Sequence, residues 1–298
     1  MESVIECRGL SHAYGRKKVL NDLNFSAPPG RILGLLGKNG AGKTTTINIL
    51  MGFLEPLAGD CRIFGEPSHN IRPLTRRRIG LLHEGHLQYD FMTIHQIERF
   101  HSRFYPNWNR SIFFELIDKL NLKLNHKIRK MSCGQRSQVA LGLILAQEPE
   151  LFMLDDYSMG LDAGYRRLFL ELFCQKVRQT GRTVLLTSHI VQDLEKLVDD
   201  IIILHQGRVL VQSPLTDFMK NIKSYSFSIN SENGAVPMPR DEVILNHEQV
   251  GPDNTVFSYE NLDSVKNRLD ALGFKVANLR SEPLGGLEDV FIGLTGRY

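Results

Sequence analysis

The sequence predicts an α/β protein whose core is a mostly parallel sheet covered by helices on both faces. Short, nearly continuous apolar runs alternate with stretches of helical periodicity over residues 1–220. Strands whose two faces are both buried have this pattern, because the residues that point to either face are apolar. After Lys220 polar and apolar residues begin to alternate, which predicts a separate, small α+β region at 221–298.

The apolar runs of the first region are short enough to be strands rather than helices. They are Val4–Cys7, Ile32–Leu36, Leu151–Leu154, Thr183–Leu186 and Ile201–Leu204. Apolar residues spaced by three and four predict helices at Thr44–Met51 and Tyr165–Gln179. A mainly helical stretch at about 88–146 is therefore expected to form a helical subdomain inserted into the core.

The region after Lys220 is predicted to fold as an α+β annex. Strands are expected in "SYSFSI", "VILNHEQV", "NTVFSYE" and "FKVANLR", and helices in "NLDSVKNRLDALG" and from Leu287 onward. An annex of about 70 residues is marginal for independent stability, so it is expected to lean on the main domain.

Composition excludes several classes of protein. Lys and Arg number 36 against 33 Asp and Glu, and the net charge of +3 gives no case for a nucleic-acid partner. The 4 cysteines form no CxxC pair, which disfavours a zinc site or a disulfide framework and is typical of a reducing compartment. The apolar stretch "VALGLILA" is far shorter than the ~20 residues that span a bilayer. If the protein works at a membrane, we expect another chain to cross it.

The segment "GKNGAGKT", residues 37–44, matches the phosphate-loop pattern GxxxxGK[ST] between an apolar strand and a helix. Glycines let successive backbone N–H groups surround a phosphate, and the helix N-terminus adds its positive dipole end. Lys43 is expected to reach the β- and γ-phosphate oxygens, and the Thr44 hydroxyl to bind Mg²⁺. The predicted nucleotide-binding residues of this loop are Gly37, Asn39, Gly40, Ala41, Gly42, Lys43, Thr44 and Thr45.

Two adjacent carboxylates, Asp155 and Asp156, follow the apolar run "LFML". A phosphate-bound Mg²⁺ needs a second protein oxygen, which a carboxylate at the tip of a neighbouring strand supplies. Asp155 is therefore the predicted metal ligand beside Thr44. Asp156 alone would also suit a helix N-cap, but two acids at a buried strand end favour a chemical role.

Further motifs follow in a fixed order along the chain. Through them, the region from Val4 to about Gln212 resembles the nucleotide-binding domain of ABC transporters. "AYGRKKVL" resembles the A-loop, "MSCGQ" the signature motif, "SMGLD" the D-loop and "LTSH" the switch region. The resemblance implies an ATPase core at 1–220 with an antiparallel strand layer near the N-terminus, and an accessory domain at 221–298.

The family also implies roles for particular residues. Tyr14 would stack on adenine, and His189 would hydrogen-bond the γ-phosphate and the attacking water. Two domains face each other head to tail, so each ATP lies between the phosphate loop of one and the signature of the other. The residues expected to contact nucleotide from the signature and D-loop are Ser132, Gly134, Gln135 and Asp162.

Three positions depart from the family pattern. Cys133 replaces the first glycine of the commonest signature, and Glu84 stands where Gln is usual but can still bind Mg²⁺ or its water. Asp156 stands where Glu usually orients the attacking water, and its side chain is shorter by about 1 to 1.5 Å. Misplacement on that scale can cost ~10²-fold in rate. ATP binding is thus predicted to be intact and hydrolysis to be slow unless the backbone or a water compensates.

The ending "LEDVFIGLTGR" resembles that of ATP-binding subunits of bacterial type-two exporters. This implies a subunit that powers efflux through a separate membrane permease, on the inner face of the membrane, with a homodimer favoured over a heterodimer. The neighbourhood His83–Arg103 would receive the permease. The aromatic residues Phe104, Tyr105 and Trp108 suit either docking or core packing.

Rival functions are distinguishable in the sequence. A DNA-repair or chromosome-structure ATPase would show long heptads between phosphate loop and signature, and a translation factor would carry two cassettes. A nucleotide-gated switch or sensor subunit with slow turnover stays open, and Asp156 favours it. The sequence identifies neither the cargo nor the role of the annex.

Overall fold

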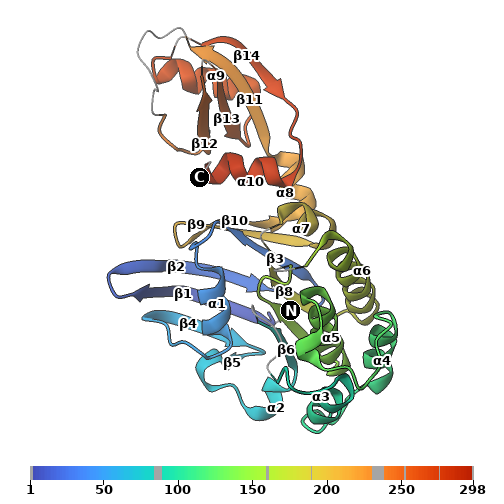
Figure 1. Ribbon diagram of the computed structural model, residues 1–298. Helices are drawn as coiled ribbons and strands as arrows, with labels where there is room; N and C mark the ends of the chain where they lie inside the picture. Colours follow the sequence, from blue (N-terminus) through green and yellow to red (C-terminus); the bar gives the residue numbers. More distant parts are fainter. Residues whose placement is uncertain are drawn as a thin grey trace. The chain divides into compact units, whose positions relative to one another are not determined.

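The computed structural model describes residues 3–83, 89–158, 161–188, 190–229, 238–251, 253–274 and 276–296. The chain divides into two compact units (Figure 1). The first comprises Met1–Ile190 and Leu197–Gln212, and the second comprises Val191–Lys196 and Ser213–Tyr298. The second unit thus begins ahead of the boundary expected at residue 221 and takes in a short segment from the middle of the chain.

The first unit is built on a central sheet with strand order β10-β9-β3-β8-β7-β6. Its strands are β3 (Ile32–Gly37), β6 (Ile79–Leu82), β7 (Leu151–Leu154), β8 (Thr183–Thr187), β9 (Asp200–His205) and β10 (Arg208–Pro214). The pairs β3/β8, β3/β9, β6/β7 and β7/β8 are parallel, as the sequence predicts. Leu35 pairs with Thr187, and Leu154 with Leu186, so the carboxyl ends of β3, β7 and β8 lie at one edge of the sheet.

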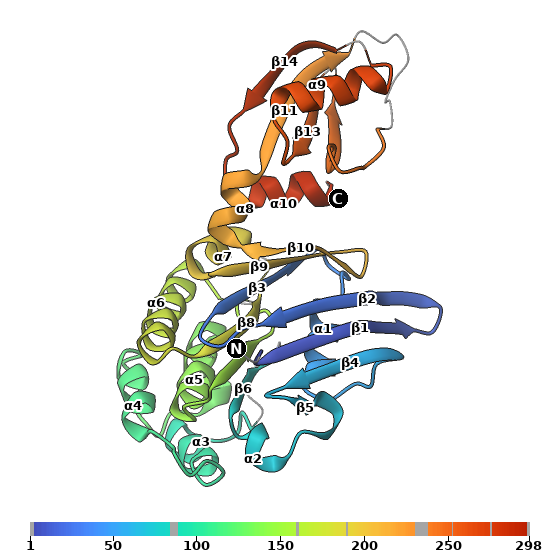
Figure 2. The same ribbon diagram turned by 180° about the vertical axis from the view of Figure 1, so that it is seen from behind.

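An antiparallel layer of β1 (Ile5–Tyr14), β2 (Lys17–Ala27), β4 (Ala58–Ile63) and β5 (Glu66–Pro67) packs over this sheet. Helix α1 (Lys43–Leu50) contributes Ile47 to the same hydrophobic core as Leu23 of this layer and Leu35 of the central sheet. Helices α5 (Cys133–Ala146) and α6 (Ala163–Thr180) cover the other face (Figures 1 and 2). The central sheet is therefore buried on both sides.

The helical subdomain contains α3 (Ile94–His101) and α4 (Arg110–Asp118) beside α5, and α2 (Pro73–Arg76) precedes it. Trp108 packs against the hydrophobic core of this subdomain, and its Nε1–H donates to Glu98 Oε1 at 3.0 Å. Arg110 donates to both oxygens of the fully buried Glu98, each at 3.0 Å. Trp108 is thus part of the core packing of this subdomain, whereas the side chain of Phe104 is 53 % exposed.

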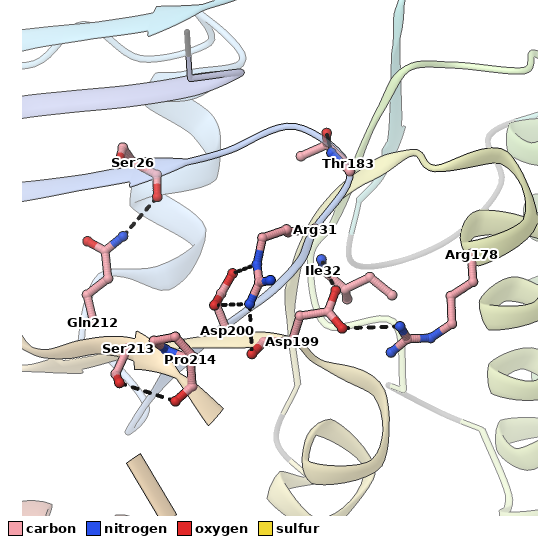
Figure 3. A network of polar contacts seen from close by, with 11 residues as sticks. Ser26, Arg31, Ile32, Arg178, Thr183, Asp199, Asp200, Gln212, Ser213 and Pro214 are labelled. Atoms are coloured by element: carbon pink, nitrogen blue, oxygen red, sulfur yellow. Dashed lines mark hydrogen bonds and ion pairs between the residues drawn. The ribbon is translucent and has the colours of Figure 1, made fainter. Parts of the chain in front are cut away.

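The amino ends of the strands are joined by a polar network at the opposite edge of the sheet (Figure 3). Asp199 accepts a hydrogen bond from Ile32 N–H at 2.9 Å and another from Arg178 at 3.1 Å. The neighbouring Asp200 binds the guanidinium of Arg31 through both of its oxygens. The start of β3, the start of β9 and the end of α6 are thereby held together.

The second unit has an antiparallel sheet of order β12-β13-β11-β14 and its own hydrophobic core. Its strands are β11 (Lys223–Ile229), β12 (Asn246–Val250), β13 (Asp253–Ser258) and β14 (Val276–Glu282). The helices are α7 (Val191–Leu197), most of which belongs to this unit, α8 (Leu215–Asn221), α9 (Leu262–Ala271) and α10 (Leu287–Thr295). The core includes Tyr225 and Phe227 of β11 and Leu269 of α9. The four strands, α9 and α10 match the predicted α+β pattern, whereas α7 and α8 begin ahead of residue 221 and were not expected in this unit.

Helix α7 is bonded to α10 inside the second unit. Glu195 Oε2 accepts a hydrogen bond from Leu287 N–H at 3.2 Å, at the first residue of α10. Gln192 Nε2 donates to Glu288 Oε2 at 2.7 Å. A helix N-terminus leaves backbone N–H groups without helical partners, so Glu195 acts as a cap supplied from a distant part of the chain.

Among the residues that the structure describes, no helix is both long enough and apolar enough to span a membrane.

Candidate functional site

The carboxyl edge of the central sheet opens into a cavity of about 470 Å³. The cavity is formed by the phosphate loop, the tips of β7 and β8, and the end of β1. Its lining residues are Tyr14, Lys17, Val19, Asn39, Gly40, Gly42, Lys43, Thr44, Thr45, Asp155, Asp156 and Thr187. Most of the residues predicted to contact nucleotide or metal within one chain therefore lie around one space, and Lys17, Val19 and Thr187 join them without having been predicted.

The phosphate loop leads from β3 into α1 through two glycines that admit no side chain. Gly42, the N-cap of α1, has φ of 107°, and a Cβ there would lie 2.4 Å from Leu20 Cδ2. A Cβ on Gly37 would lie 2.8 Å from the Cβ of Ala41. The loop is consequently packed tightly against its surroundings at these two positions.

Lys43 lies in the first turn of α1 and is 8 % exposed. Its ammonium donates to Gly37 O at 2.7 Å and to Lys38 O at 3.2 Å. These carbonyl groups hold the charge over the loop, at the positive end of the helix dipole. The arrangement provides a site for an anion of the size of a phosphate group.

Asp155 is 1 % exposed at the tip of β7. Its Oδ1 accepts hydrogen bonds from Thr187 Oγ1 at 3.0 Å and Thr44 Oγ1 at 3.3 Å. Within the described part of the chain, its Oδ2 is buried without a hydrogen-bond partner. A buried carboxylate oxygen in that state is costly unless a cation binds it, and with the Thr44 hydroxyl it offers the oxygen ligands that Mg²⁺ prefers. The residues present thus fit Mg²⁺.

Asp156 follows with φ of 47°, in the left-handed region that Asp tolerates better than most residues, and it is 7 % exposed. Its backbone N–H donates to Thr187 Oγ1 at 2.8 Å, and its Oδ1 accepts from Ser158 Oγ at 3.3 Å. The Thr187 hydroxyl therefore accepts from Asp156 and donates to Asp155, which fixes both acids from the tip of β8.

Tyr14 ends β1 at the mouth of the cavity, where its side chain is 52 % exposed. The ring meets the ring of His12 edge to face, with centroids 4.9 Å apart and planes at 77°. One face of an aromatic ring held in this way is available for stacking on a nucleotide base.

The signature residues lie away from this cavity, at the N-terminus of α5. Ser132 is the N-cap: its Oγ accepts from Gln135 N–H at 3.2 Å, and the Gln135 side chain accepts from Ser132 N–H at 3.0 Å. A Cβ on Gly134 would lie 2.4 Å from the ring of Tyr165, so this position also requires glycine for packing inside the chain. Asp162 caps α6 through Tyr165 N–H at 2.9 Å. None of Ser132, Gly134, Gln135 and Asp162 lines the described cavity.

Two predicted residues, Glu84 and His189, lie outside the residues that the structure describes. Their assignments stay predictions from the sequence.

This chain is similar to a protein-family model, to characterised proteins and to solved structures. Residues 20–158 match the family model described as "ABC transporter". The bacitracin transport ATP-binding protein BcrA of Bacillus licheniformis is 28 % identical over 99 % of this chain and 98 % of its own length. The Nod factor export ATP-binding protein I of Burkholderia orbicola (strain AU 1054) is 30 % identical over 98 % of this chain and 97 % of its own. A solved ATP-binding subunit of an ABC transporter superposes with a TM-score of 0.65 at 28 % identity, covering 73 % of this chain and 92 % of that one.

Proposed function

The chain belongs to the ABC transporter family, as an ATP-binding, ATP-hydrolysing subunit of an export system, and we propose that it works as one of two facing copies on a membrane permease. The observation that carries this proposal is the cavity in which the phosphate loop, Lys43 and the two acids that follow β7 meet. A second copy would bring Ser132 and Gly134 of its signature to the ATP bound there.

Hydrolysis in this cavity is in-line attack of water on the γ-phosphorus, which breaks the bond to the β-phosphate oxygen and leaves ADP and phosphate. Lys43 and the loop N–H groups bind the phosphates, and Tyr14 receives the adenine. Asp156 orients and polarises the attacking water. Asp155 and Thr44 would hold Mg²⁺, which neutralises phosphate charge when bound. Glu84 and His189 are assigned to the metal and the γ-phosphate from the sequence alone.

The test is the Mg²⁺-dependent ATPase rate of the purified protein over a range of concentrations, beside Lys43→Ala and Asp156→Glu. A homodimer predicts a rate that rises more than linearly with concentration, and Lys43→Ala abolishes it. Asp156→Glu restores about 1 to 1.5 Å of side-chain reach, so it is expected to raise the rate. If Lys43→Ala hydrolyses ATP at the wild-type rate, this cavity is not the site of ATP hydrolysis.

A second cavity of the first unit, about 460 Å³ in volume, supports the proposed permease contact. It lies beside the helical subdomain and is lined mainly by apolar and aromatic side chains, with Arg76 and two histidines among them. Phe53 and Tyr89 remain 59 % and 42 % exposed at its rim. Part of the expected neighbourhood His83–Arg103 contributes to the lining. We propose that this groove receives a helix of the permease at the inner face of the membrane.

The second candidate function is a nucleotide-gated switch or sensor subunit with little transport, and Asp156 in place of Glu favours it. Reconstitution with the permease separates the two. Transport that scales with ATP turnover supports the exporter, whereas conformational change of the complex on ATP binding, without transport or appreciable turnover, supports the switch.

A further inference from the structure

Two buried serines, Ser158 and Ser188, lie beside Asp156 and are not among the residues that bind nucleotide. They are 5 % and 4 % exposed. Ser158 Oγ lies 3.3 Å from Asp156 Oδ1 and 3.1 Å from Ser188 Oγ. Ser188 Oγ in turn lies 3.0 Å from Ile190 N. A continuous chain of hydrogen bonds thus leads from the backbone beyond β8 to the carboxylate of Asp156.

The direction of every bond in this chain follows from its two ends. Ile190 N–H can only donate, so Ser188 Oγ accepts from it. Asp156 Oδ1 as a carboxylate can only accept, so Ser158 must spend its single proton on that oxygen. The bond between the two serines then has one possible sense, in which Ser188 donates to Ser158. No alternative arrangement satisfies both ends, so the hydroxyl of Ser158 is oriented toward Asp156.

A short carboxylate on a left-handed backbone needs such an anchor. Thr187 fixes the backbone N–H of Asp156, and that bond does not act on the carboxylate. Ser158 donates to one carboxylate oxygen and restrains it directly. Because hydrogen bonds to charged groups are stronger than neutral ones, the anchor is effective even at a single oxygen.

We propose that Ser158, oriented by Ser188, is a positioning residue for ATP hydrolysis that holds the Asp156 carboxylate at the angle from which it polarises the attacking water. This inference rests on the proposed role of Asp156. The competing explanation is that the two serines merely satisfy each other's buried hydroxyl groups.

The experiment compares kcat and KM for ATP, ADP affinity and thermal stability in Ser158→Ala, Ser158→Thr and Ser188→Ala. Ser158→Ala is expected to lower kcat about tenfold, with KM, ADP affinity and Tm close to those of the wild type. Ser158→Thr keeps the hydroxyl and should recover most of kcat. Ser188→Ala should lower kcat by a smaller factor, because Ser158 then loses only its orientation. Ser68→Ala, an equally buried serine outside the cavity, is the matched control.

A second background separates positioning from general packing. In Asp156→Glu the carboxylate extends one methylene beyond Ser158, so adding Ser158→Ala should change kcat less than twofold. An equal loss in both backgrounds, an unchanged kcat in Ser158→Ala, or no recovery in Ser158→Thr overturns the proposal.

Asp156→Asn tests the catalytic role of Asp156 separately from the positioning role of Ser158. Wild-type turnover in Asp156→Asn removes the catalytic role of Asp156, and the positioning role of Ser158 with it. Strong loss in Asp156→Asn with full activity in Ser158→Ala removes only the role of the serine.

Discussion

Thr187→Val tests how the two acids of the site are held. Valine has nearly the shape of threonine, so the substitution removes the hydroxyl without opening a cavity. Two interactions are lost together: the bond that Thr187 donates to Asp155 at 3.0 Å and the bond that it accepts from Asp156 N–H at 2.8 Å. Both acids are buried, at 1 % and 7 % exposed, so water replaces neither partner readily.

The magnitude follows from these two bonds. A hydrogen bond to a charged acceptor contributes about 1.5–3 kcal/mol, and a buried N–H left unpaired costs about 1–3 kcal/mol. Allowing for local relaxation, Thr187→Val should destabilise the protein by about 3 kcal/mol, or lower Tm by about 6–12 °C. Turnover should also fall, because the backbone of Asp156 is no longer fixed.

The assay is thermal unfolding with and without ADP, together with the ATPase rate at saturating ATP. Thr187→Ser is the control, since it keeps the hydroxyl and loses only a methyl group. If Thr187→Val unfolds at the same temperature as Thr187→Ser and turns over ATP as fast, the hydroxyl does not hold the acids and the reasoning fails.

Three further predictions concern other parts of the chain. Hydrogen bonds from Arg72 hold the pKa of Glu66 at about 2, below its usual 4.5. Glu66 therefore stabilises the fold fully above pH 4.5 and loses this contribution as pH falls through about 2, so Glu66→Gln should lower Tm at pH 7 and have a steadily smaller effect as pH falls from 4.5 through 2. Phe53→Asp should weaken co-purification with the permease about tenfold while the ATPase rate of the isolated protein is unchanged. Glu195→Ala should speed amide hydrogen exchange at Leu287, because the cap of α10 is lost.

Each of these predictions has a control on a neighbouring surface. Glu55→Gln removes an exposed carboxylate, and its effect on Tm at pH 7 should be smaller than that of Glu66→Gln. Leu74→Asp places the same charge on an exposed leucine outside the groove, and equal loss of the permease there would contradict the assignment of the groove. Lys196→Ala alters the exposed neighbour of Glu195, and faster exchange at Leu287 in this variant as well would show that the cap is not responsible.

The sequence predicts elements best where one pattern runs uninterrupted. The strand Leu151–Leu154 has the predicted bounds because charged residues flank four apolar ones. The predicted strand Val4–Cys7 covers only Ile5–Cys7 of β1, since the register of β1 with β2 shifts beyond Cys7 and disturbs the alternation before the strand ends at Tyr14.

The candidate site shows the same limit. Glycines and a lysine at fixed spacing predict the phosphate loop, and paired acids after an apolar strand predict its metal partner, because their chemistry has few other uses in that order. Thr187 and Ser158 leave no such trace, since a hydroxyl at a strand end is compatible with many local structures. Their roles depend on the parallel pairing of β7 with β8, which brings together residues some thirty positions apart.

The assignment of α7 to the second unit has a consequence for any shortened form of the protein. Ser188, which we propose to act on Asp156 through Ser158, precedes Val191, the first residue of the second unit's short segment, by three positions. The chain passes between the two units at three points: Ile190–Val191, Lys196–Leu197 and Gln212–Ser213. A protein ending at residue 212 would keep the whole sequence of α7 but lose α10, which Glu195 and Gln192 bind. Removing the annex therefore leaves α7 without its partner helix, in a segment that directly follows Ile190, whose N–H donates to Ser188.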